Sequence, residues 1–130
     1  MFQKLFKIIS ILVIFSTNAL ADGEATYKSI CMACHENGVS GAPKFRSIRD
    51  WAPIIKEGKV HVIAEAYNGI RKMPAQGGRP DLKLEDFSEA LIYMANASGA
   101  KWEKPSEQEY IKIRNKLAKL NSKKETQYKY

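Results

Sequence analysis

The sequence has few of the residues from which metal and catalytic sites are usually built. Its 130 residues include two cysteines and two histidines. A structural zinc site takes four ligands, so here His61 and scattered carboxylates would have to complete the set, which argues against a zinc domain. No segment alternates polar and apolar residues with the period of two that a strand requires. The sequence therefore predicts one small all-α unit.

Long apolar runs are also scarce, and the one present lies at the start of the chain. Residues 5–15 follow Lys4 and lead to the small-residue pattern of Ala19 and Ala21. A basic, an apolar and a small-residue part in this order are typical of a secretory signal peptide. The run is shorter than the roughly 20 residues that cross a bilayer, which argues against the alternative of an uncleaved anchor. We expect residues 1–21 to be removed and the remainder to be exported.

The net charge of +7 is unevenly distributed. Residues 22–100 contain ten basic and ten acidic side chains, whereas residues 101–130 contain nine basic and four acidic ones. Because the basic excess belongs to the end of the chain and not to its main part, a nucleic-acid-binding core is not expected. We expect a domain over 22–100 and a basic helical extension over 101–130.

Both cysteines lie in the segment Cys31-Met32-Ala33-Cys34-His35. The pattern C-x-x-C-H is the attachment signature of c-type haem. On a helix, residues three and four apart share a face, so two thiols can bond to the vinyl groups of one porphyrin while the imidazole reaches the iron. The alternatives are a thioredoxin-like pair, which lacks its βαβ setting here, and a plain disulfide. We predict one covalently bound haem c.

The two axial positions of such a haem need separate ligands. His35 supplies the first, and Pro43 offers a rigid carbonyl to its other ring nitrogen, although a simple turn proline explains Pro43 equally well. Met73 is the candidate for the second, because it lies in a segment without helical or strand period and precedes Pro74, which favours an extended backbone. The alternatives are an exposed loop methionine without a role, and His61 as the ligand.

Four short helices are expected around this haem. Their approximate ranges are 23–34, 50–57 with Asp50 as N-cap and Pro53 in the first turn, 59–68, and 83–97, where Phe87, Ala90, Leu91 and Met94 form an apolar face. A domain of this size has a marginal side-chain core, so a macrocycle in its middle would add the apolar surface that the polypeptide lacks. Trp51 and Phe45 are candidates for contact with its edge, or ordinary core aromatics.

The order of these motifs resembles that of class I monohaem cytochromes, and most closely the cytochrome c5 group of bacterial periplasmic electron carriers. The resemblance covers about residues 24–98 and departs from that group at Lys83, where a Ser or Thr often caps the last helix, and in the absence of a second cysteine pair. The motifs are Cys31-Met32-Ala33-Cys34-His35, Gly41-Ala42-Pro43-Lys44, Trp51-Ala52-Pro53 with Gly58, Met73-Pro74-Ala75-Gln76-Gly77-Gly78, and Ala90-Leu91-Ile92-Tyr93-Met94.

The resemblance implies a small class I cytochrome c fold in which four helices wrap one haem. It implies thioether bonds from Cys31 and Cys34, iron ligation by His35 and Met73, and a hydrogen bond from the His35 ring to the Pro43 carbonyl. It also implies a one-electron shuttle that is not an enzyme and exchanges electrons with redox proteins of the periplasm.

Two other classes of function remain open at this point. One is a haem-based ligand sensor or peroxidase-like enzyme in which Met73 is displaced, and the other is a thiol–disulfide protein without haem. No Ser/His/Asp set, carboxylate pair or phosphate loop points to substrate chemistry. Nothing in the sequence demands more than a monomer.

The extension has a helical pattern of its own. Ser106 and Glu109 have the spacing of a capping box. Apolar and basic residues then occupy opposite faces of the predicted helix, the apolar ones being Tyr110, Ile113, Leu117 and Leu120 and the basic ones Lys112, Arg114, Lys116 and Lys119. This helix either folds back onto the domain or docks on an acidic partner or an anionic membrane surface.

Overall fold

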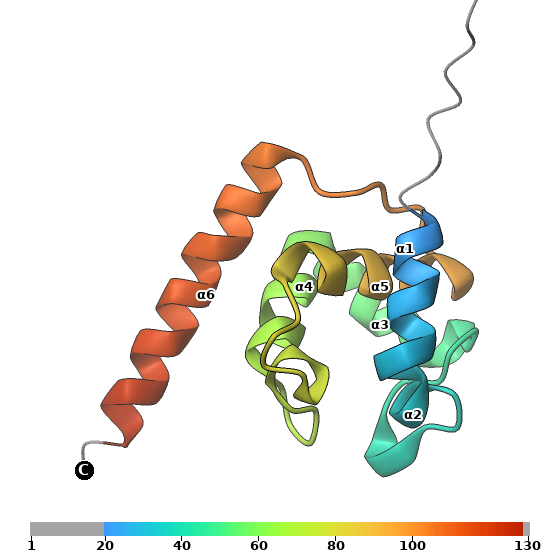
Figure 1. Cartoon of the computed structure of the whole chain (residues 1–130), viewed down its shortest axis with the longest axis horizontal. Coiled ribbons are helices and arrows are strands. Elements are labelled where there is room, and N and C mark those ends of the chain that lie inside the picture. The colour runs from blue at the N-terminus through green and yellow to red at the C-terminus, as the bar shows by residue number, and fades with distance from the viewer. Residues whose placement is uncertain (1–19, 129–130) are drawn as a thin grey trace, which may run out of the picture.

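The computed structural model describes residues 20–128, and most of them are helical (Figure 1). Apart from one antiparallel bridge between Ile70 and Met73, these residues form no strand, so the all-α prediction is confirmed. The predicted signal peptide lies outside the described residues except for its last two positions. The elements are α1 (Leu20–Thr26), the π-helical turn η1 (Tyr27–Cys31), α2 (Met32–His35), the 3₁₀ turn η2 (Val39–Gly41), α3 (Ile48–Glu57), α4 (Lys59–Asn68), the 3₁₀ turn η3 (Ala75–Gly78), α5 (Leu84–Ala97) and α6 (Glu107–Gln127).

Helices α1 and α5 cross at very close range (Figure 1). Gly23 on α1 faces the backbone of α5, and a Cβ built on it would lie 2.4 Å from the carbonyl oxygen of Glu89. Ala90, the next residue on α5, is fully buried. Only a residue without a side chain allows this approach, so Gly23 sets how the start of the domain packs on its last helix.

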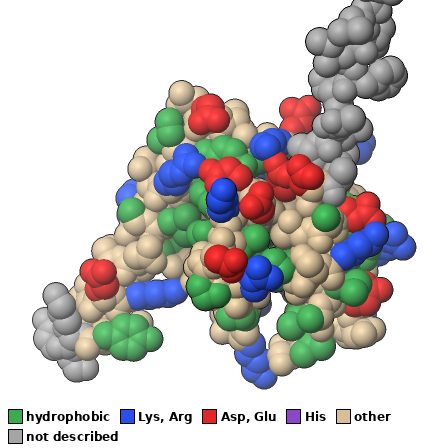
Figure 2. All heavy atoms as spheres, in the orientation of Figure 1, with side chains coloured by type: hydrophobic (Ala, Val, Ile, Leu, Met, Phe, Trp, Pro, Cys, Tyr) green, Lys and Arg blue, Asp and Glu red, His purple; other side chains and the backbone are tan. Residues whose placement is uncertain are grey.

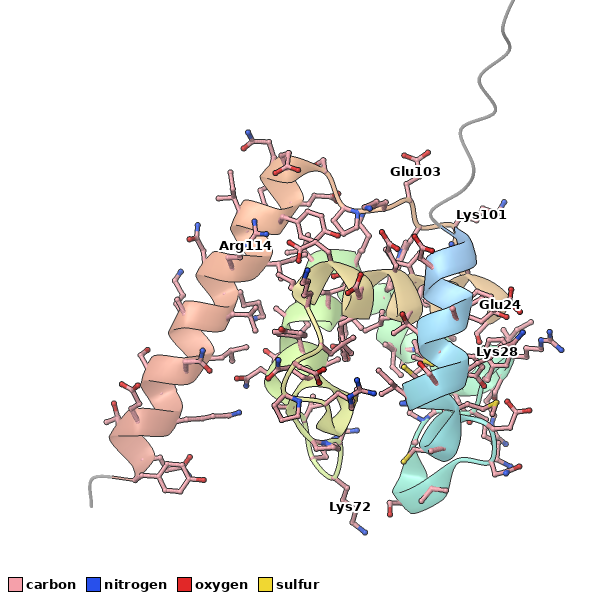
Figure 3. The ribbon with its side chains drawn as sticks, in the orientation of Figure 1. Glu24, Lys28, Lys72, Lys101, Glu103 and Arg114 are labelled. Atoms are coloured by element: carbon pink, nitrogen blue, oxygen red, sulfur yellow. The ribbon has the colours of Figure 1, made fainter. Side chains whose placement is uncertain are left out.

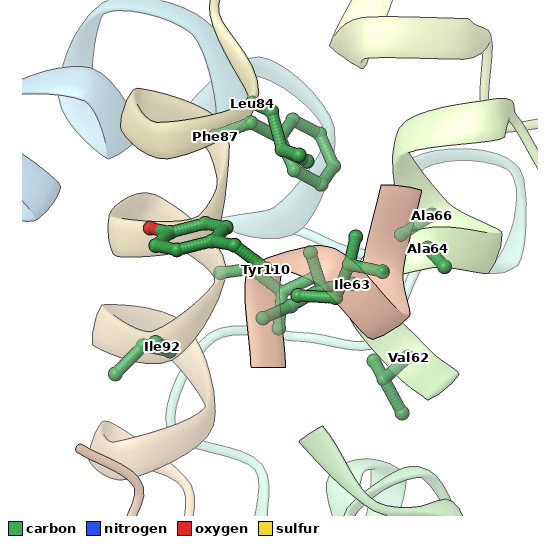
Figure 4. Close-up of a cluster of buried hydrophobic side chains, with 10 residues drawn as sticks. Val62, Ile63, Ala64, Ala66, Leu84, Phe87, Ile92 and Tyr110 are labelled. Carbon is green, nitrogen blue, oxygen red and sulfur yellow. The ribbon is translucent and has the colours of Figure 1, made fainter. Parts of the chain in front are cut away.

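The buried side chains form two clusters. The larger one joins α4, α5 and α6 and consists of Val62, Ile63, Ala64, Ala66, Leu84, Phe87, Leu91, Ile92, Tyr110 and Ile113 (Figure 4). The smaller one joins η1, α3 and the end of α5 and consists of Tyr27, Trp51, Met94, Ala95 and Ala100. Ile54 and Trp102 pack against both. The core is therefore divided into two parts that share α5.

The predicted start of the second helix is wrong. Helix α3 begins at Ile48, and its N-cap is Ser47, whose Oγ accepts a hydrogen bond from the Asp50 backbone N–H at 3.2 Å. Both Ser and Asp are good caps, but Ser47 comes earlier in the chain, so the helix starts there and Pro53 lies beyond its first turn. The predicted helices at 59–68 and 83–97 agree with α4 and α5 to within one residue.

Helix α6 folds back onto the domain. Ser106 and Glu109 form the predicted capping box, with both of its hydrogen bonds present. The side chains of Tyr110 and Ile113 are buried against α4 and α5, and Leu117 packs beside them. Acidic and basic side chains gather where the start of α6 meets the rest of the protein (Figure 2). No helix in the described part of the chain combines the length and apolarity needed to span a bilayer.

Candidate haem-binding site

The cysteine motif ends a continuous helical run made of α1, η1 and α2. Cys31 is partly buried and Cys34 is exposed, and no disulfide joins them. Burial raises the pKa of the Cys31 thiol to about 11, so an unbonded thiol here would be protonated at neutral pH. Two unbridged thiols three residues apart on a helix are the arrangement that covalent haem attachment requires.

One ring nitrogen of His35, Nδ1, forms a hydrogen bond within the described part of the chain, and the other, Nε2, does not. Its Nδ1 lies 2.8 Å from the carbonyl oxygen of Pro43, and its side chain is buried. Since a carbonyl can only accept, Nδ1 carries the proton, and in the neutral tautomer with this bond Nε2 has the lone pair that a metal would take. A second bond, from the Phe45 backbone N–H to the His35 carbonyl at 2.7 Å, ties the same loop to the motif. The structure thus brings together the two residues that the sequence paired.

Met73 lies in a tight turn and not in an irregular loop. Its backbone N–H donates to the carbonyl of Ile70 at 2.9 Å, and its carbonyl accepts from the Ile70 N–H at 3.0 Å. The side chain is half-buried against the larger core cluster. Lys72 projects at the tip of this turn (Figure 3), where a solvated charge is expected. The backbone of the candidate second ligand is therefore held at both of its polar groups.

A polar residue that the sequence reasoning missed holds the following segment. The amide of Gln76 donates to the backbone oxygens of Pro80 and Leu82, at 2.9 and 3.2 Å, and to the hydroxyl of Tyr67 at 3.1 Å. Tyr67 itself donates to the Leu82 carbonyl at 2.8 Å. Gln76 has a φ of 55°, a conformation that a non-glycine residue adopts only under constraint. Its place before two glycines was the available signal for such a turn.

The two halves of the site meet and suit a haem. A Cβ built on Gly77, in η3, would lie 3.3 Å from Cγ2 of Ile30, the residue before the cysteine motif. The Met73 segment therefore reaches the helix that carries Cys31. The Met73 side chain packs on the larger core cluster and the Cys31 side chain on the smaller one. Two free thiols, an imidazole nitrogen and a thioether are the groups that a covalently bound haem takes, so the residues fit the group.

The structure also places the remaining candidate residues. His61 is half-exposed on α4, with Nε2 at 3.4 Å from Glu57 and 4.0 Å from Glu65. Among the described residues there is no group of three or more His, Cys, Asp or Glu side chains that could hold a metal ion. Trp51 and Phe45 are parts of the smaller cluster, where the Phe45 ring stacks on Tyr27 with centroids 4.5 Å apart.

Comparison with known proteins shows the family of the chain. The family model described as cytochrome c oxidase, cbb3-type, subunit III, matches residues 18–94. Cytochrome c-555 of Chlorobaculum thiosulfatiphilum is 38% identical over 82 residues, which are 60% of this chain and 95% of that protein. Cytochrome c5 of Ectopseudomonas mendocina is 35% identical over 71 residues, or 50% of this chain and 77% of that protein.

A solved structure gives the same result for the fold. It is a chain in the crystal structure of the electron transfer complex of nitrite reductase with cytochrome c, with a TM-score of 0.56 and 34% identity over 59% of this chain and 94% of that one. With the family match, the relatives and the donor set, the chain belongs to the cytochrome c family of electron carriers, as a class I monohaem cytochrome that carries covalently bound haem c.

Proposed function

We propose that this chain is a periplasmic one-electron carrier whose domain, residues 22–100, holds a single six-coordinate haem c. Cys31 and Cys34 would attach it, and His35 and Met73 would bind its iron from opposite sides. The observation that carries the proposal is the 2.8 Å contact between His35 Nδ1 and the Pro43 carbonyl, because it fixes the tautomer in which Nε2 is a metal ligand.

When bound, haem c supplies an iron centre that gains and loses one electron. The protein's part is to keep its two ligands unchanged while this happens. The Pro43 carbonyl holds the proton on Nδ1 and so keeps the His35 ring in one orientation. The turn closed by Ile70 holds Met73, whose neutral thioether favours reduced iron and gives a higher potential than a second imidazole would.

With both His35 and Met73 bound to the iron, no position would remain for a substrate or a gas. This argues for electron transfer over the sensor or peroxidase-like alternative, in which Met73 would have to leave. Export rests on residues 1–21, whose sequence has the parts of a signal peptide. Redox proteins are the proposed partners, as in the related complex with nitrite reductase, and a monomer is sufficient for this function.

Absorption spectra of the holoprotein test the ligand assignment. We expect the oxidised wild type to show the weak far-red charge-transfer band of methionine-ligated iron, and the reduced protein to show no shift with carbon monoxide. Met73→Ala should remove the band and lower the potential. Met32→Ala, which changes an exposed methionine next to Cys31, is the matched control and should leave both unchanged.

Two results would contradict the proposal. If the band survives in Met73→Ala, Met73 is not the ligand. If the reduced wild type binds carbon monoxide readily, the methionine position opens and the sensor or peroxidase-like function is favoured.

A further inference from the structure

The C-terminal helix α6 runs alongside α4 and contacts it through three polar side chains. Three lysine contacts join the two helices at the start, the middle and the end of α4, and they follow the same order along α6. They are Lys59 with Glu109 at 2.9 Å, Lys116 with Glu65 at 3.2 Å, and Lys124 with the backbone oxygen of Asn68 at 2.7 Å. Between them, Ile113 and Leu117 pack on α4 and its neighbours. The two helices are therefore parallel.

The third contact differs from the other two in its acceptor. Asn68 is the last residue of α4, and the carbonyls of a helix's last turn have no partner within the helix. Asn68 as a residue is buried, at 9% exposure. A lysine ammonium at this end satisfies the acceptor and also interacts favourably with the negative end of the helix dipole. Lys124 thus serves as a cap for α4 that comes from another helix.

The capped carbonyl lies at the base of the Met73 turn. After Asn68 the chain reverses at Gly69, which has a φ of 88°, and the next residue is Ile70, whose N–H and carbonyl both bond to Met73. Three residues of chain thus connect the Lys124 contact to the backbone pair that holds Met73. A Cβ on Gly69 would lie 2.8 Å from the Ala75 backbone nitrogen, so the turn is closed tightly.

We propose that Lys124 is a positioning residue for Met73: by holding the Asn68 carbonyl, the C-terminal extension fixes the base of the Met73 turn and so keeps the methionine on the iron. The inference rests on the proposed ligation by Met73. In Figure 1 the C-terminal end of α6 stands apart from the rest of the ribbon, and the Lys124 side chain spans the distance to the Asn68 oxygen. The adjacent Lys123 is exposed and forms no ion pair with another described residue.

Hydrogen exchange of the Ile70 and Met73 amides tests the contact directly. In Lys124→Leu we expect these two amides to exchange about tenfold faster, the effect of losing one charged contact at a helix end. The far-red band should also disappear at a lower denaturant concentration, before the loss of helical circular dichroism. Lys123→Leu, one residue away with the same change of charge, should behave as wild type, and Lys124→Arg should restore most of the protection.

The outcomes separate this inference from the ligand assignment. Equal exchange in Lys124→Leu and Lys123→Leu would overturn the role of Lys124, and so would faster exchange of all core amides together, which would indicate a purely structural contact. If the wild type lacks the far-red band, it is the ligation by Met73 that fails. Amide exchange would then still report whether Lys124 holds the turn.

Discussion

Replacing Gly23 by alanine probes the crossing of α1 and α5 with a single methyl group. The new Cβ would lie 2.4 Å from the Glu89 carbonyl oxygen and 2.8 Å from its carbon. Both atoms belong to the backbone of a buried helix, so neither can turn aside as the end of a side chain would. The two helices must move apart by about 1 Å to restore an ordinary contact distance.

The size of the effect follows from two opposing contributions. Forcing an extra carbon into a packed contact costs about 1–3 kcal/mol, and a backbone neighbour places Gly23 at the upper end. Alanine is the better helix former by about 1 kcal/mol, which offsets part of that cost. We therefore expect Gly23→Ala to lower the free energy of unfolding by about 2 kcal/mol.

Denaturant unfolding followed by circular dichroism measures this directly. The reverse change at an exposed position of the same helix, Ala25→Gly, is the control, and it should cost about 1 kcal/mol through helix propensity alone. The two variants then report packing and propensity separately. A Gly23→Ala protein as stable as the wild type, or more stable, would mean that the helices do not meet at this point.

Two further predictions concern Tyr27 in η1 and Ser106 at the start of α6. The Tyr27 hydroxyl donates a hydrogen bond to Glu36 at 2.6 Å, and burial, together with that carboxylate, raises the pKa of Tyr27 above its ordinary value of 10.0. Because the unfolded chain then loses this proton first as the pH rises, the free energy of unfolding should fall above about pH 10. It should fall less steeply in Tyr27→Phe, which a comparison of denaturant midpoints across that pH range measures. Ser106→Ala removes half of the capping box with Glu109 and should lower the free energy of unfolding by about 1 kcal/mol, with earlier exchange of the first amides of α6, whereas unchanged protection there would show that the cap contributes nothing.

Local patterns in the sequence were sufficient to predict most of the helices. The 3.6-residue period and the glycines that follow each segment placed α4 and α5 within one residue, because those signals act within a few residues of the chain. The start of α3 was missed since two capping residues, Ser47 and Asp50, compete there. The roles of Cys31, Cys34, His35 and Met73 as haem ligands remain predictions, while the pairing of His35 with Pro43 appears in the structure as a hydrogen bond.

The motif Cys31-Met32-Ala33-Cys34-His35 was enough to predict the kind of prosthetic group, because covalent attachment depends on a spacing that the chain carries locally. What only the tertiary structure decided are contacts between residues far apart in sequence. From the sequence alone, Gly23 is an ordinary helix-breaking glycine, and only the fold shows that the backbone of α5 lies against it. Lys124 is likewise one of many surface charges in the sequence, and only the fold shows that α6 brings it to the end of α4. Neither role leaves a local signal, because each depends on which atoms of a distant segment stand opposite.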